Sequence, residues 1–130
     1  MGSVDSDSYT TVMTAERLLV GAFALIAPGP LLTTFGVAPE FNTAAVRYAT
    51  RLFGVRNAAL GVQLWLARGD RREVVRLAGL NAAVELVDLV DGLTVAAQSR
   101  ELRRSGVAVS IVSVAAAAGF LGLRASAGRA

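Results

Sequence analysis

Charged side chains are absent from two long stretches of the chain. One stretch runs from Leu18 to Pro39 and the other from Ser105 to Leu123. Uncharged apolar segments of about 18 to 20 residues are long enough to cross the hydrocarbon core of a bilayer as helices. Two such segments in a chain of 130 residues predict a membrane protein that crosses the bilayer more than once.

The rest of the pattern predicts an all-α fold: a four-helix transmembrane bundle, antiparallel and up-down, with a proline break after the first helix. Cap and turn signals divide the chain into helices. The expected helices run from Tyr9 or Thr14 to Ala27, from an N-cap at Asn42 or Thr43 to Ala67, from Arg71 to Gln98, and from Val107 to Arg124. We expect a single domain over residues 1–130, with residues 1–8 and 125–130 flexible.

The connections between these helices carry recognisable stop and start residues. Pro28 and Pro30 end the first helix, because proline lacks the backbone N–H that a helix interior needs. A short interfacial turn with Gly36 as a stop is expected next, and a kinked helix that continues to Phe35 is the alternative. Asp70 and Glu73 form a D-x-x-E pattern that resembles a capping box at the start of the third helix.

Composition narrows the chemistry. Apolar residues make up 54% of the chain, and histidine and cysteine are both absent. Disulfides, Cys or His metal ligands and Ser-His or Cys-His nucleophile pairs are therefore excluded, and we expect no cofactor and no metal. Acid–base chemistry would have to come from Asp, Glu, Arg or Tyr. The net charge is +3, but the arginines form no single basic face, so no nucleic-acid partner is expected.

The distribution of arginines predicts the orientation in the cell membrane. Loops on the cytoplasmic side of membrane proteins are enriched in basic residues. The loop 68–73 and the C-terminal end together carry more arginines than the loop near residues 100–104. We therefore expect a multi-pass protein with both termini in the cytoplasm. The use of arginine without lysine, alongside much Ala, Gly and Val, is typical of a GC-rich bacterial genome.

Ionisable side chains interrupt the two middle helices. The third helix carries Asn81, Glu85, Asp88 and Asp91 on one face, within an arc of about 120°. A charged residue near a helix centre costs about 2.5 to 3.5 kcal/mol on insertion into a bilayer, so three ionised acids would cost about 8 to 10 kcal/mol. The helix therefore needs partners for these groups. The second helix offers Arg47, Arg51, Arg56, Asn57 and Gln63.

Counting depth from the 68–73 loop predicts which groups meet. At about 1.5 Å per residue, Arg56 and Glu85 both lie about 16 Å from that end, and Arg51 lies between Asp88 and Asp91. We therefore expect Arg51 to pair with Asp88 or Asp91. Arg56 points about 140° away from Arg51, so it is placed either near Glu85 or toward the first helix and Glu16.

Small residues predict where helices approach closely. Gly54, Ala58 and Gly61 fall on one stripe of the second helix, and Gly119 and Gly122 lie in the Ala-rich fourth helix. Small-xxx-small stripes allow membrane helices to pack backbone to backbone. The alternative is that these residues reflect only the Ala/Gly-rich composition.

The run from "APGPLLTTFGVAPEF" through "RLFGVRNAALGVQLWLA", followed by "ELVDLVDGL", resembles a group of small four-helix bacterial (actinobacterial-type) membrane proteins of unknown function. They share a loose outline with DoxX-like proteins. The shared pattern is a first helix ending in proline, then F-G, then G-x-R-[DN]-x-x-x-G, then an aspartate in the third helix. Here these are Pro28 or Pro30, Phe35-Gly36, Gly54, Arg56, Asn57, Gly61 and Asp88 or Asp91. The resemblance implies the fold and no activity.

Three classes of function fit these features. The first is a non-catalytic membrane protein whose arginine- and carboxylate-lined interior binds a lipophilic small molecule or a membrane partner. The second is a cofactor-free enzyme of the isomerase or cyclase type, and the third is a proton or solute pathway formed by an oligomer. The candidate partners are membrane lipid, a lipophilic small molecule and further copies of the chain.

The candidate site is the same in each class. Glu85, Asp88 and Asp91 are the candidate general acids or bases, with Asp88 favoured as the carboxyl that stays protonated because it lies between the other two. The candidate binding residues are Arg51, Arg56, Asn57, Asn81, Glu16 and Gln63. The competing interpretation is that the charged groups pair only to hold the helices together.

Overall fold

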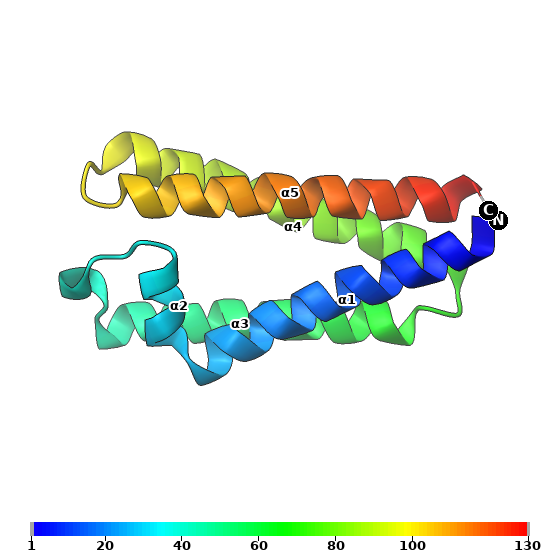
Figure 1. Ribbon diagram of the computed structural model, residues 1–130, viewed down its shortest axis with the longest axis horizontal. Coiled ribbons are helices and arrows are strands. Elements are labelled where there is room, and N and C mark those ends of the chain that lie inside the picture. The colour runs from blue at the N-terminus through cyan, green and yellow to red at the C-terminus, as the bar shows by residue number, and fades with distance from the viewer. Residues whose placement is uncertain (1, 130) are drawn as a thin grey trace.

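The computed structural model describes residues 2–129, with side chains from residue 6 onward, and the described chain is all-helical without strands. The elements are α1 (Gly2–Ile26), α2 (Pro28–Thr34), the 3₁₀ turn η1 (Pro39–Phe41), α3 (Ala44–Leu66), α4 (Arg71–Gln98) and α5 (Arg103–Arg129). The all-α prediction is confirmed. Figure 1 shows an elongated molecule in which the two chain ends and the α3–α4 loop lie at the same end.

The four long helices associate two by two. α1 packs mainly on α3, and α4 packs mainly on α5, whereas α3 and α4 meet at few positions although they are consecutive in the chain. Figure 1 shows these two pairs as separate layers that come together toward the chain termini. The long helices thus form two pairs, and the pairs contact each other mainly through side chains.

Glycines allow close approach within each pair. A Cβ added to Gly21 of α1 would lie 2.7 Å from the backbone nitrogen of Ala58, and one added to Gly54 would lie 2.9 Å from the carbonyl oxygen of Gly21. In the other pair, a Cβ on Gly106 would lie 2.5 Å from the carbonyl oxygen of Gly92. The predicted small-residue stripe on α3 is confirmed as a packing surface, because a larger side chain would push the helices apart.

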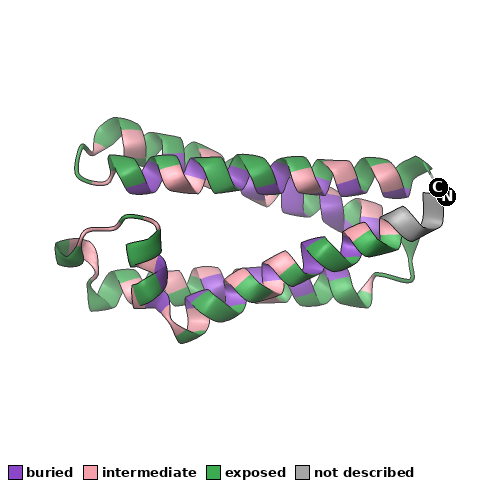
Figure 2. Cartoon of the chain, viewed as in Figure 1, coloured by how far each residue is buried: buried purple, intermediate pink, exposed green. Residues whose placement is uncertain are grey.

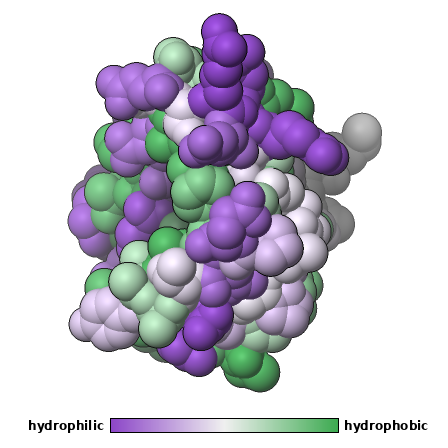
Figure 3. Space-filling model, turned by 90° about the vertical axis from the view of Figure 1, so that its left-hand side faces the viewer, coloured by the Kyte–Doolittle hydropathy of each residue, from purple (hydrophilic) through white to green (hydrophobic). Residues whose placement is uncertain are grey.

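The apolar core lies toward the end that carries the termini. Figure 2 shows buried residues along the inward faces of the long helices. The core residues there share full or nearly full burial and come from all four long helices; they are Met13, Leu64, Val74, Leu77, Ala78, Ala82, Phe120, Leu123 and Ala127. The other end of the molecule, which carries the α4–α5 loop, presents interspersed hydrophilic and apolar side chains (Figure 3). The two helix pairs are therefore closed by a core at one end.

Both terminal helices are longer than the sequence predicted. α1 begins at Gly2, and α5 continues to Arg129, so the expected flexible ends are helical within the described residues. Packing explains both extensions: Tyr9 lies against the apolar core, and Ala127 is a buried member of it. α5 also starts earlier than expected, at Arg103, after the Ser99 hydroxyl accepts a hydrogen bond from the Leu102 N–H at 3.2 Å.

The proline segment combines the two alternatives that the sequence allowed. The chain breaks at Ala27 and then forms the short helix α2, with Pro28 at its first turn. Gly36 ends this helix with a φ of +77°, a left-handed conformation that favours glycine. The predicted caps of the next two helices are confirmed, because Thr43 accepts from Val46 N–H and Asp70 accepts from the Arg72 and Glu73 N–H groups.

Candidate functional site

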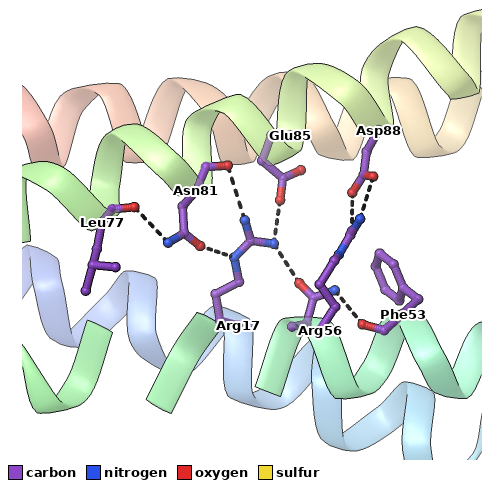
Figure 4. A network of polar contacts seen from close by, with 8 residues as sticks. Arg17, Phe53, Arg56, Leu77, Asn81, Glu85 and Asp88 are labelled. Atoms are coloured by element: carbon purple, nitrogen blue, oxygen red, sulfur yellow. Dashed lines mark hydrogen bonds and ion pairs between the residues drawn. The ribbon is translucent and has the colours of Figure 1, made fainter. Parts of the chain in front are cut away.

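A buried arginine from α1 is the centre of the polar interior. Arg17 is 1% exposed, and its Nη1 lies 2.5 Å from Oε1 of Glu85 on α4. The same guanidinium donates to Oδ1 of Asn57 on α3 at 2.6 Å and, through Nε, to Oδ1 of Asn81 on α4 at 2.8 Å. Figure 4 shows these groups converging on Arg17 between the two helix pairs. One side chain thus connects three helices.

Backbone hydrogen bonds hold the two amides in the orientation that Arg17 needs. Nδ2 of Asn57 donates to the Phe53 carbonyl at 3.0 Å, and Nδ2 of Asn81 donates to the Leu77 carbonyl at 2.9 Å (Figure 4). Each amide therefore turns its oxygen toward the guanidinium. Both asparagines are fully buried, where an unmatched polar group would be costly. The geometry explains why two amides occur in otherwise apolar helix faces.

An aromatic ring completes the surroundings of Arg17. The guanidinium carbon lies 4.7 Å from the centre of the Phe120 ring, which belongs to α5. A cation over an aromatic face is stabilised by the ring quadrupole, and more so when both are shielded from water. Arg17 consequently contacts every other long helix of the molecule.

A second ion pair lies beside the first. Arg56 of α3 donates to both carboxylate oxygens of Asp88 on α4, with distances of 3.1 Å and 2.5 Å (Figure 4). The Asp88 side chain is 15% exposed and that of Arg56 is 38% exposed. Arg56 also lies over the Phe53 ring, at 5.0 Å from its centre. A two-pronged arginine–carboxylate pair is among the strongest hydrogen-bonded pairs in proteins.

The pairing predicted for Arg51 is wrong. Arg51 is exposed and forms no ion pair within the described part of the chain, whereas Arg56 takes Asp88. Asp88 lies about one helical turn beyond the depth that matches Arg56, and the long arginine side chain covers that difference. Both placements predicted for Arg56 are wrong as well: its guanidinium binds Asp88 of α4 instead of facing Glu16 of α1, and Glu85 is bound by Arg17.

The other predicted site residues fall into two groups. Asn57, Asn81 and Glu85 belong to the Arg17 network. Gln63 is exposed and lies away from it. Asp91 is classed as an exposed residue, and part of it lines the cleft described next.

An elongated cleft extends from this network toward the end of the molecule opposite the core. Its volume is about 540 Å³. Most of its wall is apolar and comes from α1, α2, α3 and α5. The apolar lining includes Phe23, Leu31, Phe35, Phe53, Val109 and Val112. Glu16, Arg17, Asn57, Glu85, Asp88 and Asp91 supply the polar part. The cleft is thus a mainly apolar space with a charged side, which is the usual character of a small-molecule site.

Among the described residues, Glu16 contributes an unsatisfied carboxylate oxygen to this cleft. Its Oε2 is shielded from solvent and has no hydrogen-bond partner among the described residues. The neighbouring Arg17 is already matched by Glu85 and the two amides. Buried polar atoms without a partner are uncommon in native structures and frequently mark functional positions. A ligand with a hydrogen-bond donor would satisfy this oxygen.

Arg17 was missed by sequence reasoning, although a signal for it exists. Buried positions on α1 follow the helical spacing Thr10, Met13, Thr14, Arg17, Gly21 and Ala24. An arginine on the same stripe as the packing glycine Gly21 must point into the protein. The arginine would have required acceptors on the facing helices, and Asn57 and Asn81 are the amides available there.

Within the described residues, no three His, Cys, Asp or Glu side chains are placed to hold a metal ion. The chemistry that the site offers is therefore that of carboxylates, guanidiniums and amides. It can orient a polar group, accept hydrogen bonds and, through Glu16, exchange a proton with a bound molecule.

Comparison with known proteins places this arrangement in a family. No curated protein and no solved structure matches the chain. A family model described as Domain of unknown function (DUF4267) matches residues 14–123, which include both ion pairs and the whole lining of the cleft. Its span also contains the motif of Gly54, Arg56, Asn57 and Gly61, whose members pack on α1 or join the polar network. The chain belongs to the DUF4267 family, whose function is unknown.

Proposed function

We propose that the protein is a multi-pass membrane protein that binds a lipophilic small molecule in the cleft between its two helix pairs. Two of its helices, in the segments Ser6–Ile26 and Arg103–Arg129, are long and apolar enough to cross a membrane. Large apolar side chains are exposed on all four long helices, among them Leu19, Leu52, Val87 and Ile111. Lipid contact would account for this exposed apolar surface.

The proposed topology has all four long helices across the bilayer and both termini in the cytoplasm. Charges on α3 and α4 require compensation in such an arrangement, and the Arg17–Glu85 and Arg56–Asp88 pairs compensate Arg56, Glu85 and Asp88. The arginine-rich α3–α4 loop lies at the same end as the termini (Figure 1). This supports a cytoplasmic location for that end. The proposal includes a bacterial source for the protein and a relationship to DoxX-like proteins.

The observation that carries the binding proposal is the cleft itself. Its wall is mainly apolar, and its volume of about 540 Å³ falls in the range of small-molecule sites. Among the described residues that line it, Glu16 has a carboxylate oxygen that is shielded from solvent and has no hydrogen-bond partner. A purely structural set of ion pairs would not need such a space beside it. Binding of a lipophilic molecule is therefore favoured over a scaffold role for the charged groups.

A cofactor-free enzyme is the second candidate, and the same Glu16 favours it. A carboxyl group beside a cleft and without a hydrogen-bond partner can act as a general acid or base. Asp88 is less suited to this role than the sequence indicated, since Arg56 binds both of its oxygens. In this version Glu16 exchanges the proton, and Arg17 and Arg56 fix the surrounding charges.

The binding proposal can be tested with a neutral fluorescent lipophile. N-phenyl-1-naphthylamine should bind saturably to the protein in phosphatidylcholine nanodiscs, above the signal of empty nanodiscs. Val109→Trp places a bulky ring in the cleft wall and should abolish the saturable component. The matched control is Val114→Trp, on the same helix at an exposed position. Equal binding by both variants, or none by the unmodified protein, would contradict the proposal.

A further inference from the structure

We infer that the ligand of this cleft is a lipophilic amine, an elongated apolar molecule with one protonated amino group placed at Glu16. The inference rests on the proposed function and adds the charge and shape of the bound molecule. It comes from three observations: the balance of charge around the cleft, the position of the unsatisfied oxygen, and the length of the cleft along α3.

The charges around the cleft do not balance. The carboxylates of Glu16, Glu85, Asp88 and Asp91 line it, whereas in the described part of the chain their only ion-pair partners are Arg17 and Arg56. The residues of α2 and α5 that line the cleft include no ionisable side chain. Arg51 of α3 is exposed and does not line the cleft. Acids thus outnumber bases by two. A cationic ligand would reduce this excess, whereas an anionic ligand would increase it.

The unsatisfied oxygen of Glu16 selects a ligand with a hydrogen-bond donor. The guanidinium of Arg17 already serves Glu85, Asn57 and Asn81, so it has little left to offer an anionic headgroup. Oε2 of Glu16 lacks a donor among the described residues. An ammonium group has three N–H donors and no acceptor, so it matches a carboxylate oxygen of this kind. A hydroxyl group would match the oxygen without the charge.

The shape of the cleft selects an elongated molecule. Ser105 also lines the cleft, is 8% exposed, and has a buried hydroxyl oxygen without a partner among the described residues. Along α3 the lining runs from Val46 to Asn57 of the Arg17 network, which is 11 residues or about 16 Å of helix. Apolar residues such as Val109 and Val112 also line the cleft. An extended alkyl chain fits such a space better than a compact molecule.

Three probes with one tail can test the inference. Dodecylamine, dodecanol and dodecanoate are titrated against bound N-phenyl-1-naphthylamine in phosphatidylcholine nanodiscs, with each concentration expressed per lipid. The amine is protonated at pH 7, as a lysine side chain is. We expect its half-displacement concentration to be about tenfold lower than that of the alcohol, since one charge-assisted hydrogen bond separates them. Dodecanoate should be the weakest.

The variant Glu16→Gln assigns the effect to one residue. It should reduce the difference between amine and alcohol to about threefold or less, while displacement by the alcohol persists. The matched control is Glu101→Gln, an exposed acid in the α4–α5 loop, which should keep the full difference. The probe series on the unmodified protein decides the matter by itself if Glu16→Gln does not fold.

The outcomes distinguish the proposed amine ligand from the proposed lipophile-binding site. Displacement by dodecanol or dodecanoate as strong as by dodecylamine would overturn the amine while leaving a lipophile site in place. An amine preference that persists in a folded Glu16→Gln protein would overturn the role of Glu16. Absence of saturable N-phenyl-1-naphthylamine binding would instead remove the proposed function, and the amine with it.

Discussion

Replacing Arg17 by methionine should destabilise the protein more than any other single arginine substitution. The side chain is 1% exposed, and methionine fills much of its volume without its charge. Glu85 would lose its ion-pair partner, and breaking a buried pair in this way costs about 3 to 5 kcal/mol. Asn57 and Asn81 would each keep a buried oxygen without a donor, at about 1 kcal/mol or more each. We expect a total near 5 kcal/mol, because the amides can partly reorient.

The measurement is reversible unfolding in mixed micelles, followed by circular dichroism. The double variant Arg17→Met, Glu85→Gln removes both charges and should be more stable than the sum of the single effects predicts, by about 2 to 3 kcal/mol. The control is Arg51→Met, an exposed arginine without an ion pair in the described structure, which should change stability by less than about 0.5 kcal/mol. Similar losses for Arg17→Met and Arg51→Met, or additive effects in the double variant, would refute the role given to Arg17.

Three further predictions follow from the packing, the topology and the second ion pair. Gly21→Ala should destabilise the protein by about 1 to 3 kcal/mol in the same unfolding assay, because its Cβ would lie 2.7 Å from the Ala58 backbone nitrogen, whereas Gly128→Ala meets nothing within 4 Å and should be neutral. Single cysteines at positions 69 and 101 should react with an impermeant thiol reagent from opposite sides of the membrane; labelling from one side would contradict four spans. Asp88→Asn should destabilise the protein by about 1 to 3 kcal/mol in the same unfolding assay, because Arg56 would lose the carboxylate that accepts both of its hydrogen bonds.

The sequence was sufficient to predict an all-α fold with four long helices, and to place the acids of α4 on one face. Local interactions determine the helix caps at Thr43 and Asp70 and the helix stop at Gly36. Such interactions, like the uncharged runs, can be recognised from neighbouring residues in the sequence. The clustering of Glu85 and Asp88 on one face depends on helical spacing alone. These features needed no knowledge of which helices are neighbours.

The partners of the acids could not be predicted in the same way. A helix that begins at Thr14 has Arg17 in its first turn, where a charged side chain can reach water. In the structure α1 begins at Gly2, which moves Arg17 to the middle of a helix, where its charge must be matched inside the protein. The association of α1 with α3, and of α4 with α5, depends on long-range packing, which local sequence patterns do not predict.

The position of Arg17 early in the chain has a consequence for how the protein is made. Glu85 leaves the ribosome about 70 residues after Arg17, a delay of about 4 to 14 s at ordinary rates of synthesis. In the proposed topology, the first helix would hold a cation in lipid during that interval without its counter-ion, and a lone arginine opposes release into the bilayer. The α1–α3 pair should therefore remain beside the insertion machinery until α4 emerges. Shortened chains that stop before residue 81 should cross-link to that machinery, and chains that extend past residue 88 should be released.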